Sequence, residues 1–361
     1  MRKRILIIKD IDTFTFMHQN DIRFMNRALH LARLGRGNVS PNPLVGSVIV
    51  CDGKIIGEGY HEKCGEAHAE VNAINSVMDK SLLPKSTIYV NLEPCAHFGK
   101  TPPCANLIIE SKIPRVVIGC VDSYSEVAGK GIEKMQKEGI DVTVGVLEKE
   151  SLALNKRFFT FHTHKRPYII LKWAQSANGF MDIKRTKSDK GVFWITQPET
   201  KTLVHKWRAE EAGILVGRHT IENDNPSLTC RDYIGNHPTR FVIDKDLKTN
   251  YADFNISKDD VTTHILNAIE NKIIGNIHFI KVSNFDLKSI LNEIYKLTIQ
   301  SIIIEGGKYT LAQFIEQNLW DEARVLTGVD NIKNGIKAPI LFDQKVETFY
   351  FGKDLVEIYQ K

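Results

Sequence analysis

Apolar positions along the chain form short continuous runs that alternate with helix-spaced stripes, which is the pattern of an α/β fold. The first stripe predicts a helix that begins near Asp21, because its apolar residues share the spacing of one helix face: Met25, Ala28, Leu29 and Ala32. Apolar runs at 44–50 and 55–57 follow, and the Asp52-Gly53 pair between them is typical of a hairpin turn. A helix followed by a β-hairpin is therefore expected.

A second stripe predicts the next helix, whose buried face would consist of Ala67, Val71, Ile74 and Met78. Buried strands are predicted at 87–92 and 116–121, and further helices at 105–111 and 130–138. Strands that alternate with helices in this way predict a layered domain in which helices cover a sheet.

After residue 148 the sequence turns polar and basic, up to His162-Thr163-His164-Lys165-Arg166-Pro167, and a second alternating series follows. We therefore expect two domains, at 17–163 and 166–361. Residues 1–16 have no evident core to join, so we expect either a disordered extension or a gene start placed before a true initiator at Met17. The second series predicts strands at 168–174, 214–217, 241–244, 277–282 and 301–305, and helices at 200–211, 287–297 and 311–319.

Length and composition agree with two domains but do not identify a partner. The chain has 361 residues, more than one ordinary domain, with 42% hydrophobic and 25% charged residues. Its net charge of +5 suits an anionic small substrate as well as a polynucleotide. The apolar run at 5–8 is too short for a signal peptide, and no run reaches the roughly 18 residues of a membrane span. A cytoplasmic protein without a membrane partner is expected.

Two short motifs combine into a candidate zinc site. His68 lies in Gly65-Glu66-Ala67-His68-Ala69-Glu70, and Cys95 lies in Glu93-Pro94-Cys95, with Cys104 further on. One imidazole and two thiolates leave a fourth zinc position open to water, as in catalytic sites, where zinc makes hydroxide at neutral pH. Glu70 would carry protons beside it. His-x-Glu followed by Pro-Cys is the signature of zinc deaminases that act on amino-substituted nucleobases.

Each of these residues alone has a simpler explanation. A lone cysteine is usually a small buried hydrophobic residue, which accounts for Cys51, Cys120 and Cys230. That explanation does not cover one histidine, one glutamate and two cysteines arriving together. His61 and Cys64 are near the motif, and neither is expected to bind the metal. In a cytosolic protein, the six cysteines are not expected to form a disulfide framework.

One departure from the general deaminase signature identifies a narrower family. The general pattern has two residues between its cysteines, whereas eight separate Cys95 from Cys104. With this loop, and with the flanking segments Ser40-Pro41-Asn42-Pro43-Leu44-Val45-Gly46 and Val127-Ala128-Gly129-Lys130-Gly131, the region resembles the deaminase half of the bifunctional riboflavin-synthesis deaminase–reductases of bacteria. The resemblance implies a cytidine-deaminase-like three-layer domain. It also implies a diaminopyrimidinone substrate bearing a ribose 5-phosphate, held by Asn42, Glu70, His97 and Lys100.

Weaker motifs in the second domain become informative together. Glu305-Gly306-Gly307 closes an apolar strand before a helix, where glycines let backbone amides approach a phosphate, although a plain tight turn has the same sequence. This turn and Lys172 resemble the reductase half of the same family, as do three segments: Trp194-Ile195-Thr196, Arg208-Ala209, and Asp224-Asn225-Pro226-Ser227-Leu228-Thr229-Cys230-Arg231. The resemblance therefore covers both domains in the family's order.

The resemblance implies a dihydrofolate-reductase-like second domain that uses NADPH. The implied NADPH contacts are Ala174, Trp194, Thr220, Asp224, Gly306 and Gly307. Arg208 and Arg231 would face the substrate phosphate, which suits the planar fork of arginine. The ribose would open to an imine that receives hydride at C1′, with Lys172 and Glu305 handling protons. Deamination would precede reduction, and family members commonly form homo-oligomers.

Two positions depart from the reductase pattern. Many members have Ser-Leu-Asp-Gly where this chain has Ser176-Ala177-Asn178-Gly179, so the turn should survive without the aspartate's charge. Many members also have a substrate-contacting serine where Val192 lies, so one hydrogen bond worth about 1 kcal/mol would be missing.

Three alternatives remain open at this point. A tRNA or nucleobase deaminase with an accessory nucleotide-binding domain shares the zinc motif, but it predicts the short cysteine spacing. A non-catalytic binding module with structural zinc has no need for Glu70. A deaminase fused to a pterin or folate reductase differs only in the substrate of the second half.

Overall fold

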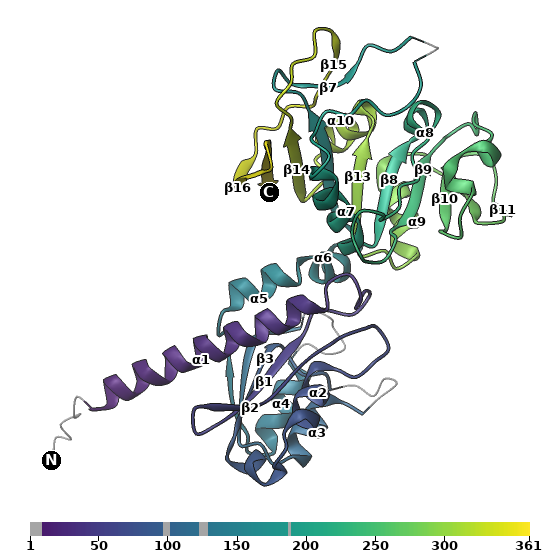
Figure 1. The fold of residues 1–361 in the computed structure, drawn as a ribbon. Coiled ribbons are helices and arrows are strands. Elements are labelled where there is room, and N and C mark those ends of the chain that lie inside the picture. Colours follow the sequence, from purple (N-terminus) through teal and green to yellow (C-terminus); the bar gives the residue numbers. More distant parts are fainter. Residues whose placement is uncertain (1–8, 97–101, 123–128, 187–188) are drawn as a thin grey trace. The chain divides into compact units, whose positions relative to one another are not determined.

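The protein is described by a computed structural model that covers residues 9–96, 102–122, 129–186 and 189–361. The chain separates into two compact units, Met1–Thr163 and His164–Lys361 (Figure 1). Each unit has its own sheets and its own buried core, so the two are described in turn. Within the described ranges, no helix is both long and apolar enough to cross a bilayer.

The first unit is built on a five-stranded sheet with the order β2-β1-β3-β4-β5. The strands are β1 (Gly46–Cys51), β2 (Lys54–Tyr60), β3 (Thr87–Leu92), β4 (Arg115–Cys120) and β5 (Asp141–Val144). Strands β1 and β2 form the expected antiparallel hairpin, in which Asp52 and Gly53 have φ values of 49° and 71°. Strands β3, β4 and β5 run parallel, so their carboxyl ends share one edge.

Helices cover both faces of this sheet. Helices α1 (Lys9–Leu34) and α5 (Glu148–Leu154) pack on one face, and α2 (Ala69–Ser76), α3 (Cys104–Glu110) and α4 (Lys130–Lys137) pack on the other. The 3₁₀ helix η1 (Lys80–Lys85) precedes β3, and α6 (Lys156–His164) ends the unit. The expected three-layer domain is confirmed.

The first unit differs from the expected elements in three places. Helix α1 begins at Lys9 rather than near Asp21, so residues 9–16 continue a helix instead of lacking structure, because each residue added to a packed helix gains a backbone hydrogen bond. Helix α2 ends at Ser76, which leaves Met78 97% exposed while Val77 is buried. The polar segment after residue 148 forms α5 and α6, whose short apolar stripes escaped the pattern.

The second unit has a ten-stranded sheet with the order β11-β12-β10-β9-β8-β13-β6-β14-β17-β16, and β15 pairs with β7 in a separate ribbon. The strands are β6 (Tyr168–Gln175), β7 (Phe180–Ile183), β8 (Gly213–Gly217), β9 (Thr239–Ile243), β10 (Thr263–Asn267), β11 (Lys272–Ile274), β12 (Ile277–Lys281), β13 (Ser301–Gly306), β14 (Glu322–Thr327), β15 (Gly335–Lys337), β16 (Gln344–Phe351) and β17 (Asp354–Gln360). Those from β12 to β14 in the sheet order run parallel, and β11, β17 and β16 are antiparallel.

Helices again cover both faces. The helices are α7 (Thr200–Glu210), α8 (Arg218–Asp224), α9 (Leu287–Lys296) and α10 (Lys308–Glu316), with 3₁₀ turns η2 (Tyr251–Asp253) and η3 (Asn255–Ser257). Leu291 of α9 and Phe314 of α10 join the core on one face. Trp207 of α7 and Ile221 of α8 join the clusters on the other. The expected α/β architecture of the second domain is confirmed.

Several strands of this unit were not expected. They include β10, β14, β16 and β17. Strand β16 is mostly exposed at the sheet edge, so its sequence lacks the alternation that marks a half-buried strand. The expected central strands, including β6, β8 and β13, each contain a continuous run of buried apolar residues, which is why the sequence pattern located them well.

Candidate active sites

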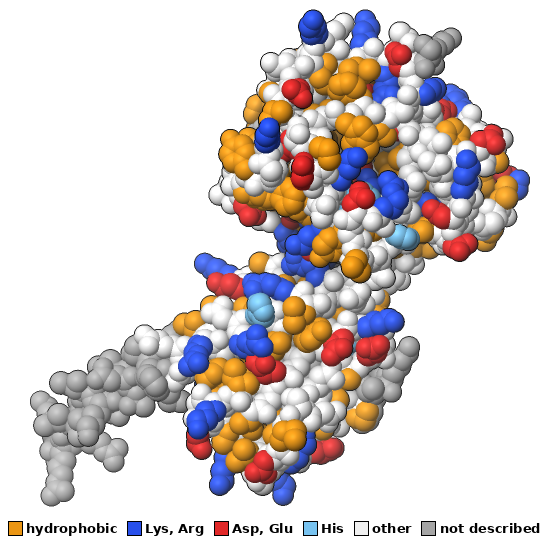
Figure 2. Space-filling view, viewed as in Figure 1, with side chains coloured by type: hydrophobic (Ala, Val, Ile, Leu, Met, Phe, Trp, Pro, Cys, Tyr) orange, Lys and Arg blue, Asp and Glu red, His pale blue; other side chains and the backbone are white. Residues whose placement is uncertain are grey.

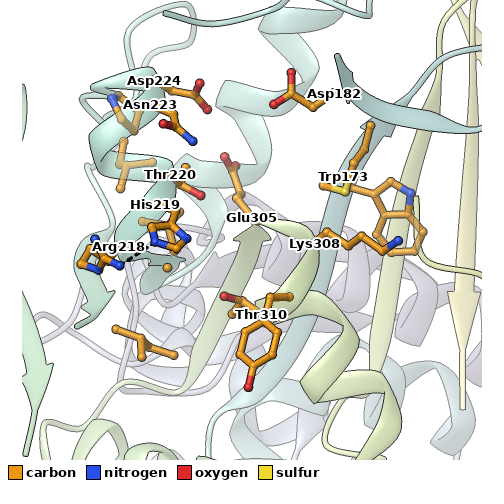
Figure 3. A pocket seen from close by; sticks show the side chains of 18 of the residues that line it. Trp173, Asp182, Arg218, His219, Thr220, Asn223, Asp224, Glu305, Lys308 and Thr310 are labelled. Atoms are coloured by element: carbon orange, nitrogen blue, oxygen red, sulfur yellow. Dashed lines mark hydrogen bonds between the residues drawn. The ribbon is translucent and has the colours of Figure 1, made fainter. Parts of the chain in front are cut away.

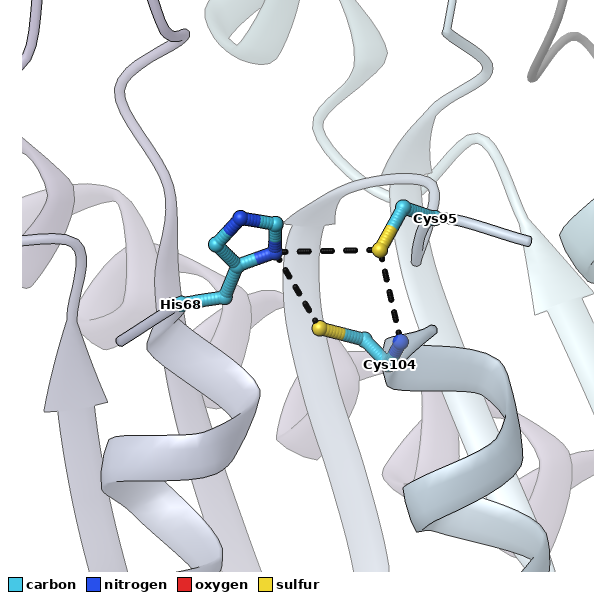
Figure 4. A group of neighbouring side chains, drawn as sticks. All are labelled: His68, Cys95 and Cys104. Carbon is cyan, nitrogen blue, oxygen red and sulfur yellow. Dashed lines mark hydrogen bonds between the residues drawn. The ribbon is translucent and has the colours of Figure 1, made fainter. Parts of the chain in front are cut away.

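Three side chains of the first unit point toward one another from separate elements (Figure 4). His68 caps the start of α2, Cys104 is the first residue of α3, and Cys95 follows β3 in a loop. His68 Nδ1 lies 3.3 Å from Cys104 Sγ and 3.7 Å from Cys95 Sγ. The backbone amide of Cys104 donates to Cys95 Sγ at 3.3 Å, which ties the two cysteines together.

This donor set fits zinc. With Zn–S near 2.3 Å and Zn–N near 2.0 Å, ligand atoms at tetrahedral angles lie about 3.5 to 3.8 Å apart. The three ligand atoms of this chain all lie within 4.8 Å of one another, at separations close to those values. The group holds three ligand residues within the described part of the chain, so a tetrahedral ion would keep one position for a reacting molecule.

Glu70 lies in the first turn of α2, two residues after His68, and its side chain is buried. Burial raises the pKa of Glu70 to about 7, and the negative charge of Cys95 acts in the same direction. A carboxyl group with this pKa is present in both protonation states near neutral pH, which suits a group that must accept and return a proton.

Glu93 fixes the loop that carries Cys95. Its buried carboxylate accepts hydrogen bonds from four backbone amides, those of Asp122, Gly129, Gly131 and Ile132, at 2.9 to 3.4 Å. A Cβ atom on Gly131 would lie 2.2 Å from the Pro94 carbonyl oxygen, so only glycine allows this close packing. The sequence motifs around Cys95 and Gly129 therefore meet in one polar cluster.

Asn42 reaches this region through His61. Asn42 Nδ2 donates to His61 Nε2 at 3.0 Å, and His61 Nδ1 donates to the Ala67 carbonyl oxygen at 3.0 Å. Both ring nitrogens of His61 are therefore engaged, and burial lowers the pKa of this imidazole. Cys64 is exposed, and neither residue joins the three-ligand group. His97 and Lys100, the other two residues expected to hold substrate, lie outside the described residues.

The second unit contains a pocket of about 1080 Å³ at the carboxyl ends of its central strands (Figure 3). It is lined by all the residues expected to act in this unit except Gly306: Lys172, Ala174, Trp194, Arg208, Thr220, Asp224, Arg231, Glu305 and Gly307. These residues come from positions between 172 and 307, so only the fold brings them together. The volume suits a dinucleotide and a second ligand.

Lys172, Arg208 and Glu305 form a charged cluster inside this pocket. Ile304 of β13 pairs with Leu171 of β6, so Glu305 and Lys172 follow side by side on neighbouring strands. Lys172 Nζ lies 3.9 Å from Glu305 Oε1. Arg208 donates to both carboxylate oxygens of Glu305, at 3.1 and 2.7 Å.

This cluster holds Glu305 in the ionised form. Burial by itself would raise the pKa of Glu305, but the charges of Arg208 and Lys172 and the hydrogen bonds from Arg208 outweigh it and lower the pKa to about 2. Burial lowers the pKa of Lys172, while the Glu305 charge opposes that effect. Glu305 therefore has no proton to give near neutral pH, whereas Lys172 has one that it releases more readily than an ordinary lysine.

The two arginines expected to face the substrate phosphate have different surroundings. The fork of Arg208 is occupied by Glu305, and its remaining terminal nitrogen donates to the Thr229 carbonyl oxygen at 3.3 Å. Arg231 is exposed, and it donates to Thr229 Oγ1 at 3.1 Å. His205 Nδ1 accepts the Arg231 backbone amide at 2.7 Å, which orients the loop that carries Arg231.

The Gly306-Gly307 turn lies between β13 and α10, beside the turn between β8 and α8. Gly306 has a φ of 117°, a conformation that favours glycine. A Cβ on Gly307 would lie 3.7 Å from Thr220 Oγ1, so the two turns flank one space. Backbone amides at the start of α10 suit a phosphate group, and the residues present therefore fit the cofactor that the sequence implies.

The pocket also contains basic residues that the sequence motifs did not predict. Arg218 and Lys308 both line it, and each is the first residue of a helix that directly follows a central strand (Figure 3). A search for basic residues just after buried strands could have found both, because parallel strands end at one edge.

The two departures from the reductase pattern have visible consequences. Asn178 Nδ2 donates to the Ile332 carbonyl oxygen at 2.9 Å, and Asn178 Oδ1 accepts the Ile332 amide at 3.1 Å. An aspartate cannot make the first of these bonds, because it has no N–H donor. Val192 lines the pocket and offers it no hydrogen bond from its side chain.

The surface does not display a single dominant charge on the face shown in Figure 2, where Lys and Arg side chains are interspersed with Asp and Glu on both units. A continuous basic surface, which a polynucleotide needs, is absent from that face among the residues described.

Comparisons with known proteins cover both units. Residues 18–120 match the cytidine and deoxycytidylate deaminase zinc-binding region, and residues 167–330 match the RibD C-terminal domain. The riboflavin biosynthesis protein RibD of Aquifex aeolicus is 37% identical over 94% of this chain and 98% of its own length. That of Bacillus amyloliquefaciens is 37% identical over 83% of this chain and 82% of its own length.

Solved structures agree with these sequence matches. A diaminohydroxyphosphoribosylaminopyrimidine deaminase/5-amino-6-(5-phosphoribosylamino)uracil reductase from Thermotoga maritima has a TM-score of 0.87 and 33% identity, over 95% of this chain and 99% of its own. RibD of Acinetobacter baumannii has a TM-score of 0.86 and 27% identity, over 95% of this chain and 99% of its own.

Proposed function

The chain belongs to the RibD family of bifunctional riboflavin-biosynthesis deaminase–reductases, and we propose which of its residues carry each of the two reactions. The family has a zinc-binding deaminase half and a reductase half that uses NADPH, so these are the two cofactors. The match to both halves also excludes a nucleobase deaminase with an unrelated second domain.

The first reaction is hydrolytic deamination of 2,5-diamino-6-(5-phosphoribosylamino)pyrimidin-4(3H)-one. The observation that carries the assignment is the convergence of His68, Cys95 and Cys104 beside buried Glu70. Zinc held by the three ligands would act as a Lewis acid and lower the pKa of a bound water to near neutral. Glu70 takes one proton from the attacking water and gives it to a ring nitrogen. It then takes the second proton from the resulting hydroxyl group and gives it to the departing amine, which leaves as ammonia. Asn42 holds the pyrimidine, together with His97 and Lys100.

The second reaction reduces the ribose of 5-amino-6-(5-phosphoribosylamino)uracil to a ribityl chain. NADPH supplies the hydride that reaches C1′. Lys172 supplies the proton, since its pKa is lowered by burial. Glu305 remains ionised and keeps the positive charge of Lys172 directed at the reacting ribose. The nearby cofactor contacts are Ala174, Trp194, Thr220, Asp224 and Gly307, which line the pocket, and Gly306, which precedes Gly307 in the same turn.

Arg231 is the main side chain that binds the substrate phosphate. This side chain is exposed in the pocket, whereas both arms of the Arg208 fork are engaged with Glu305. Arg208 lies beside the phosphate and contributes a weaker interaction through the N–H groups that Glu305 does not engage. The partners are thus a phosphoribosylated aminopyrimidine and NADPH, with neither nucleic acid nor membrane. The protein would form a homo-oligomer and work in the cytoplasm.

The test gives the zinc-loaded protein the diaminopyrimidinone substrate and follows ammonia release and then NADPH oxidation. The wild type should show both, in that order. Glu70→Gln should lower ammonia release by roughly 10² to 10⁴-fold, because a proton carrier is lost. The same variant should oxidise NADPH normally when the deaminated substrate is supplied. Ammonia release at the wild-type rate by Glu70→Gln would refute the role of Glu70.

A further inference from the structure

The backbone of Leu44 is held by two buried asparagine side chains from distant parts of the first unit. Asn155 Oδ1 accepts the Leu44 amide at 2.7 Å, and Asn155 Nδ2 donates to the Leu44 carbonyl oxygen at 2.9 Å. Asn91 of β3 donates to the same carbonyl oxygen at 3.0 Å and accepts the Gly46 amide at 2.8 Å. Asn91 and Asn155 are 0% and 2% exposed, so water cannot replace these bonds.

Asn155 presents the hydrogen-bonding pattern that one peptide unit requires. Its carbonyl oxygen meets an N–H group and its NH₂ group meets a carbonyl oxygen. An aspartate of the same shape would place an oxygen against the Leu44 carbonyl oxygen and a charge in a buried site. A leucine at position 155 would fill the space but leave the Leu44 amide without its acceptor. An unpaired buried donor costs more free energy than the loss of both partners of a hydrogen bond.

The position of Leu44 controls the direction of Asn42 because Pro43 lies between them. The proline ring fixes φ of Pro43, and it also restricts the backbone of the residue before it. One freely rotating backbone torsion, ψ of Pro43, therefore separates the clamped Leu44 amide from the Asn42–Pro43 peptide. At its other end, the Asn42 side chain is oriented by His61 at 3.0 Å.

We infer that Asn155 is a positioning residue of the deaminase reaction, which sets the direction of the Asn42 side chain through the backbone of Leu44. Asn155 lies between α5 and α6, beyond the residues 18–120 that match the deaminase zinc-binding region. The segment after the deaminase motifs thus completes the substrate side of their site. The inference rests on the substrate role proposed above for Asn42.

The experiment is a double-mutant cycle in the full-length, zinc-loaded protein with Asn155→Leu and Asn42→Ala. Deamination is measured as ammonia release over a range of substrate concentrations. Asn155→Leu should raise KM about tenfold and lower kcat by less than threefold, with zinc content unchanged. In the Asn42→Ala background the same substitution should change KM by less than twofold, because residues that act as a unit do not contribute additively.

Two controls separate positioning from general damage. Ser151→Ala removes a fully buried hydroxyl from α5 that has no hydrogen-bond partner among the residues described, so it should leave KM unchanged. NADPH oxidation with the deaminated substrate should match the wild type in every variant. If Asn155→Leu does not fold, Asn155→Ser keeps one hydrogen-bonding group and should raise KM about threefold.

The outcomes distinguish this inference from the proposal beneath it. Deamination at the wild-type rate by Asn42→Ala would refute the substrate role of Asn42. It would also refute this inference, which depends on that role. A defect in Asn42→Ala combined with an undiminished effect of Asn155→Leu in the double variant overturns the inference alone. So does a fall in kcat at constant KM, or loss of zinc in Asn155→Leu, since either would mean that Asn155 acts on the metal site.

Discussion

Each half of the molecule has a glutamate with little exposure at its candidate active site, Glu70 at 3% and the Glu305 side chain at 10%, and the two carboxyl groups have opposite pKa shifts. Burial raises the pKa of Glu70 to about 7. Burial acts on Glu305 in the same direction, yet Arg208 and Lys172 bring its pKa to about 2. The difference between the sites is the arginine and the lysine beside Glu305, since neither residue type contributes to the shift at Glu70, where the smaller opposing effect of His68 does not outweigh burial. Burial alone therefore does not decide whether a carboxyl group is charged.

The two sites also differ in how they are assembled. The ligand group of the first unit comes from two short motifs at helix starts and one loop. The pocket of the second unit collects single residues from many strands, helices and loops between positions 172 and 336. A change in one motif should therefore abolish the first activity outright, whereas changes in the second pocket should produce graded effects.

Removal of the metal is expected to separate the halves most completely. Cys104→Ala leaves two ligands for zinc, so metal binding and all ammonia release should be lost. NADPH oxidation with the deaminated substrate should remain at the wild-type rate. Metal analysis and the two assays measure this, with Cys51→Ala as a control thiol that is buried but outside the group. Retained ammonia release in Cys104→Ala would show that deamination does not depend on the three-ligand group.

Neutralising Glu305 should produce the next largest effect. Glu305→Gln leaves Lys172 and Arg208 without their anionic partner, so reduction should slow by about 10³-fold while deamination is unchanged. Glu322→Gln is the matched control, because Glu322 also has little exposure and an arginine partner but does not line the pocket. Equal losses of reduction in both variants would show that lost stability, rather than the site, is the cause.

Acid should weaken the reductase half. The folded pKa of Glu305 lies below its ordinary value of 4.5, so this group stabilises the fold above about pH 4.5 and loses its contribution as the pH falls toward 2. The free energy of unfolding should drop by roughly 3 kcal/mol across this range. Burial also lowers the pKa of His205 and His264 to about 4, and this destabilises the fold in the same direction as pH falls from about 6.5.

Tryptophan fluorescence can follow this unfolding selectively, because Trp173, Trp194, Trp207 and Trp320 all lie in the second unit. Comparison of the wild type with Glu305→Gln isolates the glutamate's share. A wild-type unfolding free energy that stays constant between pH 4.5 and 2 would contradict the ion cluster as described.

The smallest effect is expected at Val192. Val192→Ser restores a hydroxyl to the pocket wall, and one added hydrogen bond of about 1 kcal/mol should lower the KM for the reductase substrate about fivefold. The KM for deamination should not change. Steady-state kinetics of both steps check this, and a reductase KM equal to or above that of the wild type would show that position 192 does not contact substrate.

Much of the molecule could be predicted from the chain alone. The apolar runs located the central strands, because strands buried on both faces need no polar positions. The residue types and spacing around His68, Cys95 and Cys104 predicted a metal site, because zinc chemistry restricts its ligands to a few side chains. Edge strand β16 and helices α5 and α6 escaped, since their apolar patterns are short or exposed.

The sequence by itself determined the chemical groups available to each half and the order of the two domains along the chain. Tertiary structure alone decided the charge state of Glu305, the engagement of Arg208 with that carboxylate, and the clamping of Leu44 by Asn155. The physical reason is distance. A residue's type is local to the chain, but its pKa and hydrogen bonds depend on burial and on neighbours that here lie 97 and 111 positions away.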